Sequence, residues 1–129
     1  KSMTYSSAIF SDQHDHLELA QKNKYKKLAD LSDIKNGDKI LEIGCGWGGF
    51  SEFLGNNYDC QITAITISKE QFNFTNKRIG EANLSKKVKV LFCDYRNIEG
   101  KFDKIVSIEM FEAVGKDYWN VFFNKIESI

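Results

Sequence analysis

The fold of this chain is decided by residues 39–50, which read Lys39-Ile40-Leu41-Glu42-Ile43-Gly44-Cys45-Gly46-Trp47-Gly48-Gly49-Phe50. A short apolar run is followed by four glycines in six residues, and apolar residues then recur at the spacing of a helix face. This order predicts a strand, a tight glycine turn and a helix, which together form the first half of a nucleotide-binding βαβ unit. The glycines allow positive φ angles and a close approach of the backbone to a ligand.

The spacing of the glycines is compatible with two classes of ligand. In one reading the motif is G-x-G-x-x-G, the pattern of dinucleotide-binding folds, formed by Gly44, Gly46 and Gly49. In the other reading it is E-x-G-x-G-x-G, which begins at Glu42 and takes Gly48 as its last glycine. A bare glycine pattern does not separate the two.

The end of the second strand distinguishes these classes. A dinucleotide fold places an acid there, about 20 residues past the glycines, to bind the ribose. The second strand is expected over Gln61 to Thr66 and ends without an acid; the first acid afterwards is Glu70. A carboxylate at the end of the first strand suits a ligand with a cationic amino-acid part, because opposite charges attract. S-adenosylmethionine (SAM) is such a ligand, so the sequence favours SAM over NAD.

Length and charge limit the possible functions. The 129 residues are expected to form one domain, with an arm and a helix over 1–31 and a core over 38–129. Lys plus Arg and Asp plus Glu both number 18, so no net field draws the chain to nucleic acid or to an anionic membrane. No apolar run approaches the ~20 residues that span a bilayer, and no signal peptide opens the sequence. We therefore expect a cytoplasmic protein without a transmembrane segment.

Cysteines and histidines give no sign of a metal site. The three cysteines lack a C-x-x-C pair and are expected to be reduced, mostly buried thiols: Cys45, Cys60 and Cys93. His14 and His16 lie two residues apart, so on a helix they would not share a face.

The sequence is expected to be a fragment of a longer protein. It starts at Lys1, its helical pattern continues up to the last residue, and it contains no proline.

The first third of the chain is expected to form an arm and a helix. The arm over residues 1–14 should be ordered, because its bulky apolar residues favour burial. Asp15 and Glu18 resemble a capping box, which would open a helix to about Asp30. The apolar stripe of this helix would be formed by Leu17, Ala20, Leu28 and Leu31.

Strands and helices then alternate, which predicts an α/β fold with a parallel sheet and helices on both faces. A second capping box, Ser68 to Gln71, opens a helix that ends near Gly80 and carries Phe72, Thr75, Asn76 and Ile79 on one face. Further strands are expected over 88–92 and Lys104 to Ile108, and a last helix carries Trp119, Phe122, Ile126 and Ile129. Ligands bind beyond the carboxyl ends of such strands, where four stretches converge: Gly44–Gly49, Thr66–Gln71, Asp94-Tyr95 and Ile108–Glu112.

Five ordered motifs of this sequence resemble the cyclopropane-fatty-acid-phospholipid synthases and their relatives, which are SAM-dependent methyltransferases. The motifs are Tyr5 to Ala8, Leu41 to Gly49, Thr66 to Gln71, Asp94 to Arg96 and Met110 to Gly115. The Cys-Gly-Trp-Gly element of the second motif is much more specific than bare glycines, and the resemblance covers nearly the whole chain. It implies a Rossmann-like class I SAM-dependent methyltransferase fold, truncated here before the last strands of the sheet.

The resemblance also implies a role for each matched residue. The cofactor would be bound by Tyr5 and Ser6 above it, Glu42, Gly44 and Gly46 at the methionine part, Thr66 and Gln71 at the ribose, Asp94 and Tyr95 at the adenine, and Ile108 in the pocket wall. Catalysis would involve Ser7, if it works through its backbone N–H, and Glu112, which would help to hold a bicarbonate ion. The reaction would transfer a methyl group to the cis double bond of a phospholipid acyl chain, at the inner face of a membrane. Bicarbonate would take the proton whose loss closes a cyclopropane ring.

Three positions depart from the family pattern. Ser7 stands where many members have cysteine, Glu109 where many have glycine, and Ala113 where histidine is common. These departures indicate a different acyl substrate or a non-lipid acceptor. An N- or C-methyltransferase of a small molecule and a truncated, non-catalytic SAM-binding fragment are the alternatives, and a homo-oligomer of the full-length protein is left open. Trp47 would serve equally well as a packing residue on the first helix, and the alternative role of Tyr95 is to cover the surface of the third strand.

Overall fold

A four-stranded parallel sheet forms the centre of the protein in the computed structural model, which describes residues 3–129. Its strands are β1 (Lys39–Ile43), β2 (Gln61–Thr66), β3 (Val88–Phe92) and β4 (Lys104–Ser107), in the order β3-β2-β1-β4. The α-helices are α1 (Leu17–Leu31), α2 (Gly49–Asn57), α3 (Lys69–Glu81) and α4 (Trp119–Ser128). Three short 3₁₀ turns complete the elements: η1 (Tyr95–Asn97), η2 (Phe111–Ala113) and η3 (Lys116–Tyr118). The predicted parallel α/β sheet is confirmed.

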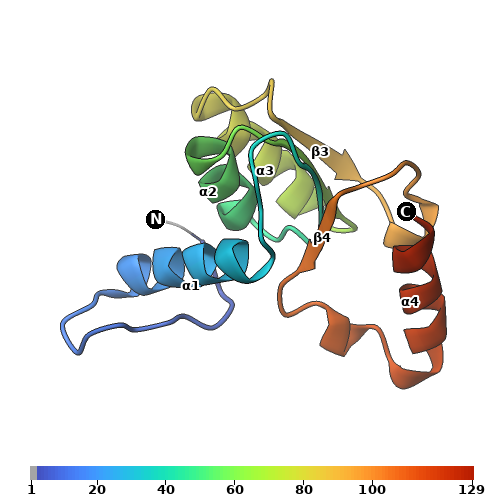
Figure 1. Ribbon diagram of the computed structural model, residues 1–129, viewed down its shortest axis with the longest axis horizontal. Helices are drawn as coiled ribbons and strands as arrows, with labels where there is room; N and C mark the ends of the chain where they lie inside the picture. The colour runs from blue at the N-terminus through green and yellow to red at the C-terminus, as the bar shows by residue number, and fades with distance from the viewer. Residues whose placement is uncertain (1–2) are drawn as a thin grey trace.

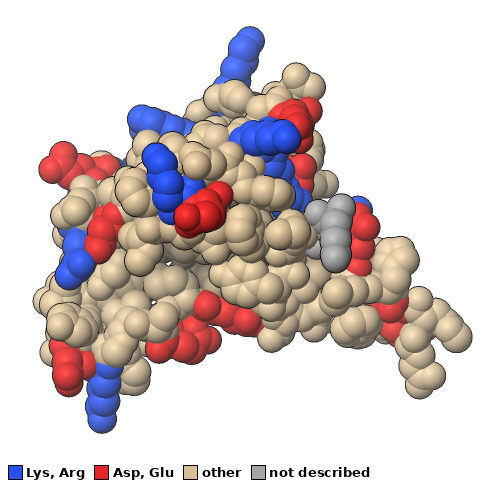
Figure 2. Space-filling view, turned by 180° about the vertical axis from the view of Figure 1, so that it is seen from behind, with Lys and Arg blue, Asp and Glu red and all other residues tan. Residues whose placement is uncertain are grey.

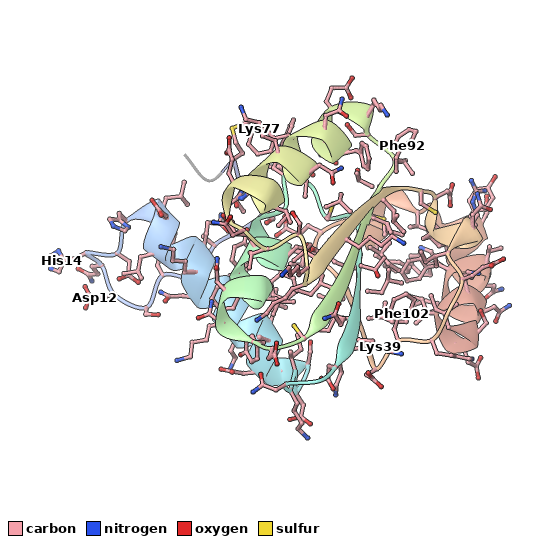
Figure 3. The ribbon with its side chains drawn as sticks, turned by 90° about the horizontal axis from the view of Figure 1, so that it is seen from above. Asp12, His14, Lys39, Lys77, Phe92 and Phe102 are labelled. Carbon is pink, nitrogen blue, oxygen red and sulfur yellow. The ribbon has the colours of Figure 1, made fainter. Side chains whose placement is uncertain are left out.

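Helices cover both faces of the sheet, as predicted (Figure 1). On one face α1, α2 and α3 share a core with the strands, which includes Tyr25, Phe50, Ile79, Ile40 and Ile62. On the other face α4 packs through a second core, which includes Phe122, Ile129, Leu41, Ile43 and Ile65. Phe102 lies between the sheet and α4 on this second face (Figure 3).

The first strand is buried along most of its length because it has a neighbour on each side. Every residue from Ile40 to Ile43 is buried, including the acidic Glu42. Glu42 lies opposite Ala64 of β2 and Val106 of β4 in the strand register. The pairing of β1 therefore places a carboxyl group in the interior of the protein, near the edge where a ligand is expected.

Three of the four glycines in the turn after β1 adopt a left-handed backbone. Gly44, Gly46 and Gly48 have positive φ, whereas Gly49 is the first residue of α2 and has none. Gly48 caps α2 with φ 79°, and a Cβ on it would lie 2.5 Å from Cγ2 of Thr75. Glycine fits there because it avoids both the clash and the strain of a left-handed backbone.

The predicted start of α1 is wrong. The helix is capped by His16, whose Nδ1 accepts a hydrogen bond from the Leu19 N–H at 3.2 Å. The Asp15 carboxylate accepts instead from the Ser11 N–H at 2.8 Å, so it closes the preceding loop rather than capping a helix. Leu17 and Leu31, the predicted ends of the apolar stripe, are exposed.

The N-terminal arm is held by polar contacts rather than by the predicted burial of its apolar residues. The arm runs beside α1 (Figure 1), and the Ile9 N–H donates to the Ala20 carbonyl at 3.1 Å. Gln21 and Lys24 are buried on the side of α1 that contacts the arm. The large apolar residues of the arm are exposed: Met3, Tyr5, Ile9 and Phe10.

Smaller differences concern the other helices and β4. Ser68 caps α3 as predicted, with its Oγ accepting from the Gln71 N–H at 3.3 Å. Asn76, expected on one helix face with Thr75 and Ile79, is exposed, whereas Thr75 and Ile79 are buried. β4 ends at Ser107, one residue before the predicted end.

Charged residues of both signs are interspersed over the upper part of the face seen in Figure 2. Within residues 3–129, no helix has the length and apolar character to cross a bilayer. In the same range, no cluster of three His, Cys, Asp or Glu side chains is arranged to hold a metal ion. His14 lies with Asp12 at the tip of the arm, far from the sheet (Figure 3). The cysteines are unpaired, with Cys45 and Cys60 buried and Cys93 partly so.

Candidate functional site

Two cavities meet at the carboxyl ends of the strands, at the edge where the sequence predicted a ligand. The larger is an open groove of about 520 Å³ that runs over the ends of β1, β2, β3 and β4. The smaller lies beneath the arm, between the glycine turn and α1. The two share Tyr5, Gly44, Gly46 and Ile108, so they form one continuous site.

Glu42 lines the smaller cavity and is the buried acid of the site. Its side chain is 2% exposed, and the Ser51 hydroxyl of α2 donates a hydrogen bond to it. Burial raises the pKa of Glu42 to about 7, against which the Ser51 hydrogen bond acts only in part. A buried carboxylate is costly unless it is paired with a charge. The cavity therefore offers a favourable place to a cationic group.

The helix α3 holds the glycine turn in place. Thr75, which is fully buried, donates its hydroxyl to the Gly46 carbonyl at 3.2 Å. Arg78 donates to the Trp47 carbonyl at 3.1 Å and pairs through Nε with Glu52 of α2 at 2.8 Å. These contacts use the carbonyl groups of the turn and leave its shape fixed before any ligand binds. Helical spacing predicts the burial of Thr75, but no sequence pattern indicates the hydrogen bonds that Thr75 and Arg78 donate to the turn.

Thr66 and Gln71 lie together in the groove, as predicted for a ribose site. The Thr66 hydroxyl donates to Oε1 of Gln71 at 2.8 Å and accepts from the Ser68 N–H at 3.1 Å. The amide oxygen of Gln71 is thus committed to Thr66, which leaves its NH₂ group as the part that would donate to a ligand. This contact also explains why the Gln71 side chain does not complete the predicted capping box.

Asp94 and Tyr95 line the groove beyond β3, but both also have partners within the protein. Asp94 pairs with Arg96 at 2.6 Å, and this hydrogen bonding holds the pKa of the Asp94 carboxyl below its usual range. Tyr95 stacks edge-on against Phe122 of α4, with the ring centres 5.2 Å apart. Arg96 therefore belongs to the groove wall, a role that its place in the sequence motif does not indicate.

The arm covers the junction of the two cavities. The Tyr5 ring is 72% exposed and lies over Gly46, where a Cβ would be 3.6 Å from the ring. The Ser6 carbonyl accepts from Gln21 at 2.7 Å, and the Ser6 hydroxyl accepts from the ammonium group of Lys24. The predicted cover residues, Tyr5 and Ser6, are therefore both at the site.

Ser7 joins the arm to the loop after β4. Its N–H donates to Oε1 of Glu109 at 2.9 Å, across 102 residues of sequence. Glu109 lines the groove and has φ 48°, a left-handed conformation that is uncommon for a residue with a side chain. Hydrogen bonding from Ser7 and the charge of Lys24 hold the pKa of Glu109 below its usual value. Burial lowers the pKa of Lys24, and the charge of Glu109 acts against that shift.

Glu112, which the resemblance assigned to catalysis, lies apart from these contacts. It is exposed on η2 and does not line either cavity, whereas Ile108, Glu109 and Met110 from the same loop line the groove. Its catalytic role stays a prediction. Glu109 was noticed in the sequence only as a departure from glycine, and its positive φ is the physical reason why glycine suits that position.

Comparison with known proteins places these features in a family. The chain matches the family described as mycolic acid cyclopropane synthetase over residues 1–129. It is 40% identical over 115 residues to a probable fatty acid methyltransferase of Pseudomonas putida, covering 88% of this chain and 29% of that protein. It is 38% identical over 125 residues to the cyclopropane-fatty-acyl-phospholipid synthase of Escherichia coli K12, covering 97% of this chain and 31% of that protein. The chain thus spans less than a third of these curated relatives.

A solved structure that shares the fold of this chain contains the bound ligand SAH. It is that of the mycolic acid cyclopropane synthase CmaA1 complexed with SAH and CTAB. The similarity has a TM-score of 0.91 at 28% sequence identity, over 96% of this chain and 44% of that one.

Proposed function

This chain belongs to the mycolic acid cyclopropane synthetase family, and from that premise we propose that it binds SAM in the continuous site between the glycine turn and the arm. The fold is that of the Rossmann-like class I SAM-dependent methyltransferases. As part of its complete protein, the chain would transfer the methyl group of SAM to the cis double bond of an unsaturated phospholipid acyl chain.

The buried Glu42 is the observation that carries this proposal. Its carboxylate lies in a cavity where the hydroxyl and the backbone N–H of Ser51 donate hydrogen bonds to it, with no cation beside it among the described residues. The amino-acid part of SAM has an ammonium group, which would supply the missing charge. NAD has no ammonium group, so it would leave the ionised Glu42 without a charged hydrogen-bond donor.

The rest of the groove supports the same orientation of the ligand. Thr66 and Gln71 offer a hydroxyl and an amide at the end of β2, where the ribose would lie. Asp94, Tyr95 and Arg96 follow at the end of β3, on the side where the adenine would lie. Ile108 lines both cavities and would contact the middle of the ligand.

The proposed alkene acceptor determines what the site has to do. Bound SAM supplies a methyl group carried on a positively charged sulfur. An alkene is a weak nucleophile, so the protein must orient the acyl chain and exclude water from the reacting groups. The arm does part of this by covering the junction of the cavities with Tyr5. The acyl chain would reach the groove from a membrane surface, with the complete protein bound peripherally at its inner face.

Bicarbonate, the second group that the resemblance implies, does not fit the site as it stands. The Ser7 N–H, the donor expected to serve catalysis, already donates to the carboxylate of Glu109. A second anion at this position would meet the negative charge of Glu109. Glu112, the residue expected to hold the ion, does not line the groove. We therefore derive no step through bicarbonate.

Calorimetry on the 129-residue chain tests the binding proposal. SAM should bind, with NAD showing no measurable heat at the same concentrations. Measurable affinity for NAD with none for SAM would refute it. Methyl transfer is tested separately with the complete reading frame that encodes this chain, using labelled SAM and vesicles of phospholipid with cis-unsaturated acyl chains. Mass spectrometry of the released fatty acids should show the added carbon.

A further inference from the structure

We propose that Glu109 is the proton acceptor of the methyl transfer, a carboxylate built into the chain that makes bicarbonate unnecessary. This inference rests on the proposed function, because it assigns a role at the same site. It differs from the expectation based on resemblance, in which Glu112 holds a separate ion.

The position of Glu109 is the first support. It follows Ile108, the residue shared by both cavities, and it lines the groove. Its backbone adopts a left-handed conformation at φ 48°, which costs free energy for any residue with a Cβ. Strained conformations of this kind are found preferentially at functional sites, where neighbouring structure holds them in place. Here the holding contact is the Ser7 N–H at 2.9 Å.

The surroundings of Glu109 keep it ionised at neutral pH. The Ser7 N–H stabilises the charged form, and Lys24 contributes a nearby positive charge, so the pKa of Glu109 lies below its usual value. Lys24 is itself fixed, because it is 6% exposed and donates to the Ser6 hydroxyl. A carboxylate has the same acceptor chemistry as bicarbonate, with one negative charge shared between oxygens. Glu109 therefore presents this chemistry without a bound ion.

The chemistry balances with Glu109 alone as the base. Methyl transfer forms a C–C bond at one alkene carbon, while the electron pair of the S–CH₃ bond stays on sulfur. The other alkene carbon is left with a positive charge. Glu109 then accepts a proton from the added methyl group or from a carbon next to the charge. The C–H electron pair neutralises the cation, either by closing a three-membered ring or by forming a new double bond. Glu109 becomes a neutral acid and later returns the proton to water.

Two substitutions distinguish the loss of the basic carboxylate of Glu109 from the loss of its side-chain volume. Glu109→Gln keeps the size and the acceptor oxygen for Ser7 but cannot serve as this base. Glu109→Gly removes the side chain, relieves the left-handed strain and opens room for an ion beside the Ser7 N–H. Glu127→Gln, an exposed carboxylate on α4, is the matched control.

The first measurement uses the 129-residue chain and needs no catalysis. Binding of ¹³C-labelled bicarbonate is followed by the NMR line of the ion, in the presence of SAM. The Glu109→Gly variant should bind the ion, whereas the wild-type chain and the Glu127→Gln control should not. Saturable bicarbonate binding by the wild-type chain would overturn the proposal. Bicarbonate binding decides the inference even if no methyl acceptor is found. A negative result for Glu109 can therefore be told apart from a failure of the proposed SAM binding or methyl transfer.

The second measurement uses the complete reading frame and the vesicle assay. In carbonate-depleted buffer the wild type and Glu127→Gln should keep their turnover, while Glu109→Gln should lose a factor on the order of 10² to 10⁴, the usual range for a positioned proton acceptor. Glu109→Gly should be inactive until bicarbonate is added. SAM affinity of Glu109→Gln should stay within about twofold of wild type, which excludes a general loss of folding. Wild-type turnover that depends on bicarbonate, or full activity of Glu109→Gln, would contradict the assignment.

Discussion

Replacement of Glu42 by glutamine should make the protein more stable at neutral and alkaline pH while weakening SAM binding. The side chain is buried, and its pKa rises from an ordinary 4.5 to about 7. At about 1.4 kcal/mol for each pH unit, this difference means that the ionised carboxylate costs the folded state about 3 kcal/mol. Glutamine has nearly the same shape and carries no charge, so Glu42→Gln removes that cost.

The pH dependence gives the prediction its sign. Because the folded-state pKa of Glu42 lies above the unfolded value, its contribution to stability is fully present below about pH 4.5 and is lost as the pH rises through about 7. Wild type and Glu42→Gln should therefore have similar free energies of unfolding near pH 4.5. At pH 8 the variant should be more stable by about 3 kcal/mol. All other ionisable groups are common to both proteins, so the difference isolates Glu42.

The assay combines denaturant unfolding with calorimetry. Urea unfolding at several pH values between 4.5 and 8.5 gives the stability difference, and titration with SAM at pH 8 gives affinity. Glu42→Gln should weaken SAM binding by about 1.5 to 3 kcal/mol, the usual contribution of a hydrogen bond to a charged group. Ser51→Ala should show the reverse stability effect, because it removes the donor that stabilises the ionised carboxylate. Loss of stability at pH 8 in Glu42→Gln, or unchanged SAM affinity, would refute this reasoning.

Three further substitutions test other parts of the site. Gln71→Ala should weaken SAM binding by about 1 to 2 kcal/mol, the cost of one lost hydrogen bond, in the same calorimetric titration; unchanged affinity would leave the Gln71 side chain only its hydrogen bond with Thr66. Gly48→Ala should destabilise the chain by about 2 to 4 kcal/mol in urea, since it adds left-handed strain and a clash with Thr75; wild-type stability would contradict the packing described. Arg78→Gln should cost about 1 to 3 kcal/mol, because it leaves Glu52 without its charged partner; a change below 0.5 kcal/mol, roughly that of a surface substitution, would show that the pair is unimportant.

The parts of the fold that depend on local periodicity could be predicted from the sequence. The apolar run before the glycines and the turn chemistry of Gly44 to Gly48 predicted the first strand and its turn. The alternation of strands and helices predicted that the sheet is parallel. The start of α1 could not be obtained in this way, because Asp15 and His16 are both adequate caps. The choice between them depends on a loop that uses the Asp15 carboxylate for itself.

The candidate site likewise has residues that local sequence patterns could locate and contacts that they could not. The location of Glu42 and of the stretch Thr66–Gln71 could be predicted, because each lies near the end of a strand or at the start of the following helix. The ribose role of Thr66 and Gln71 comes from the family resemblance and stays a prediction. The Ser7–Glu109 contact could not be predicted, since no periodicity relates two residues 102 positions apart. Thr75 illustrates a third case, in which the spacing gave its burial but not its hydrogen bond to the Gly46 carbonyl.

The hydrogen bond between Ser7 and Glu109 affects the order in which the site forms during folding. The arm precedes β4 in the chain and is therefore made before it, but its partner Glu109 lies beyond β4. Contacts between segments so distant in sequence form late, because closing a long loop costs entropy before the contact repays it. The sheet can pair β1 with β2 while the arm is still free, and only the docking of β4 brings Glu109 to its place. A chain that ends before residue 109 would therefore have its glycine turn but no contact between the arm and Glu109, and should exchange SAM with solvent far faster than the 129-residue chain.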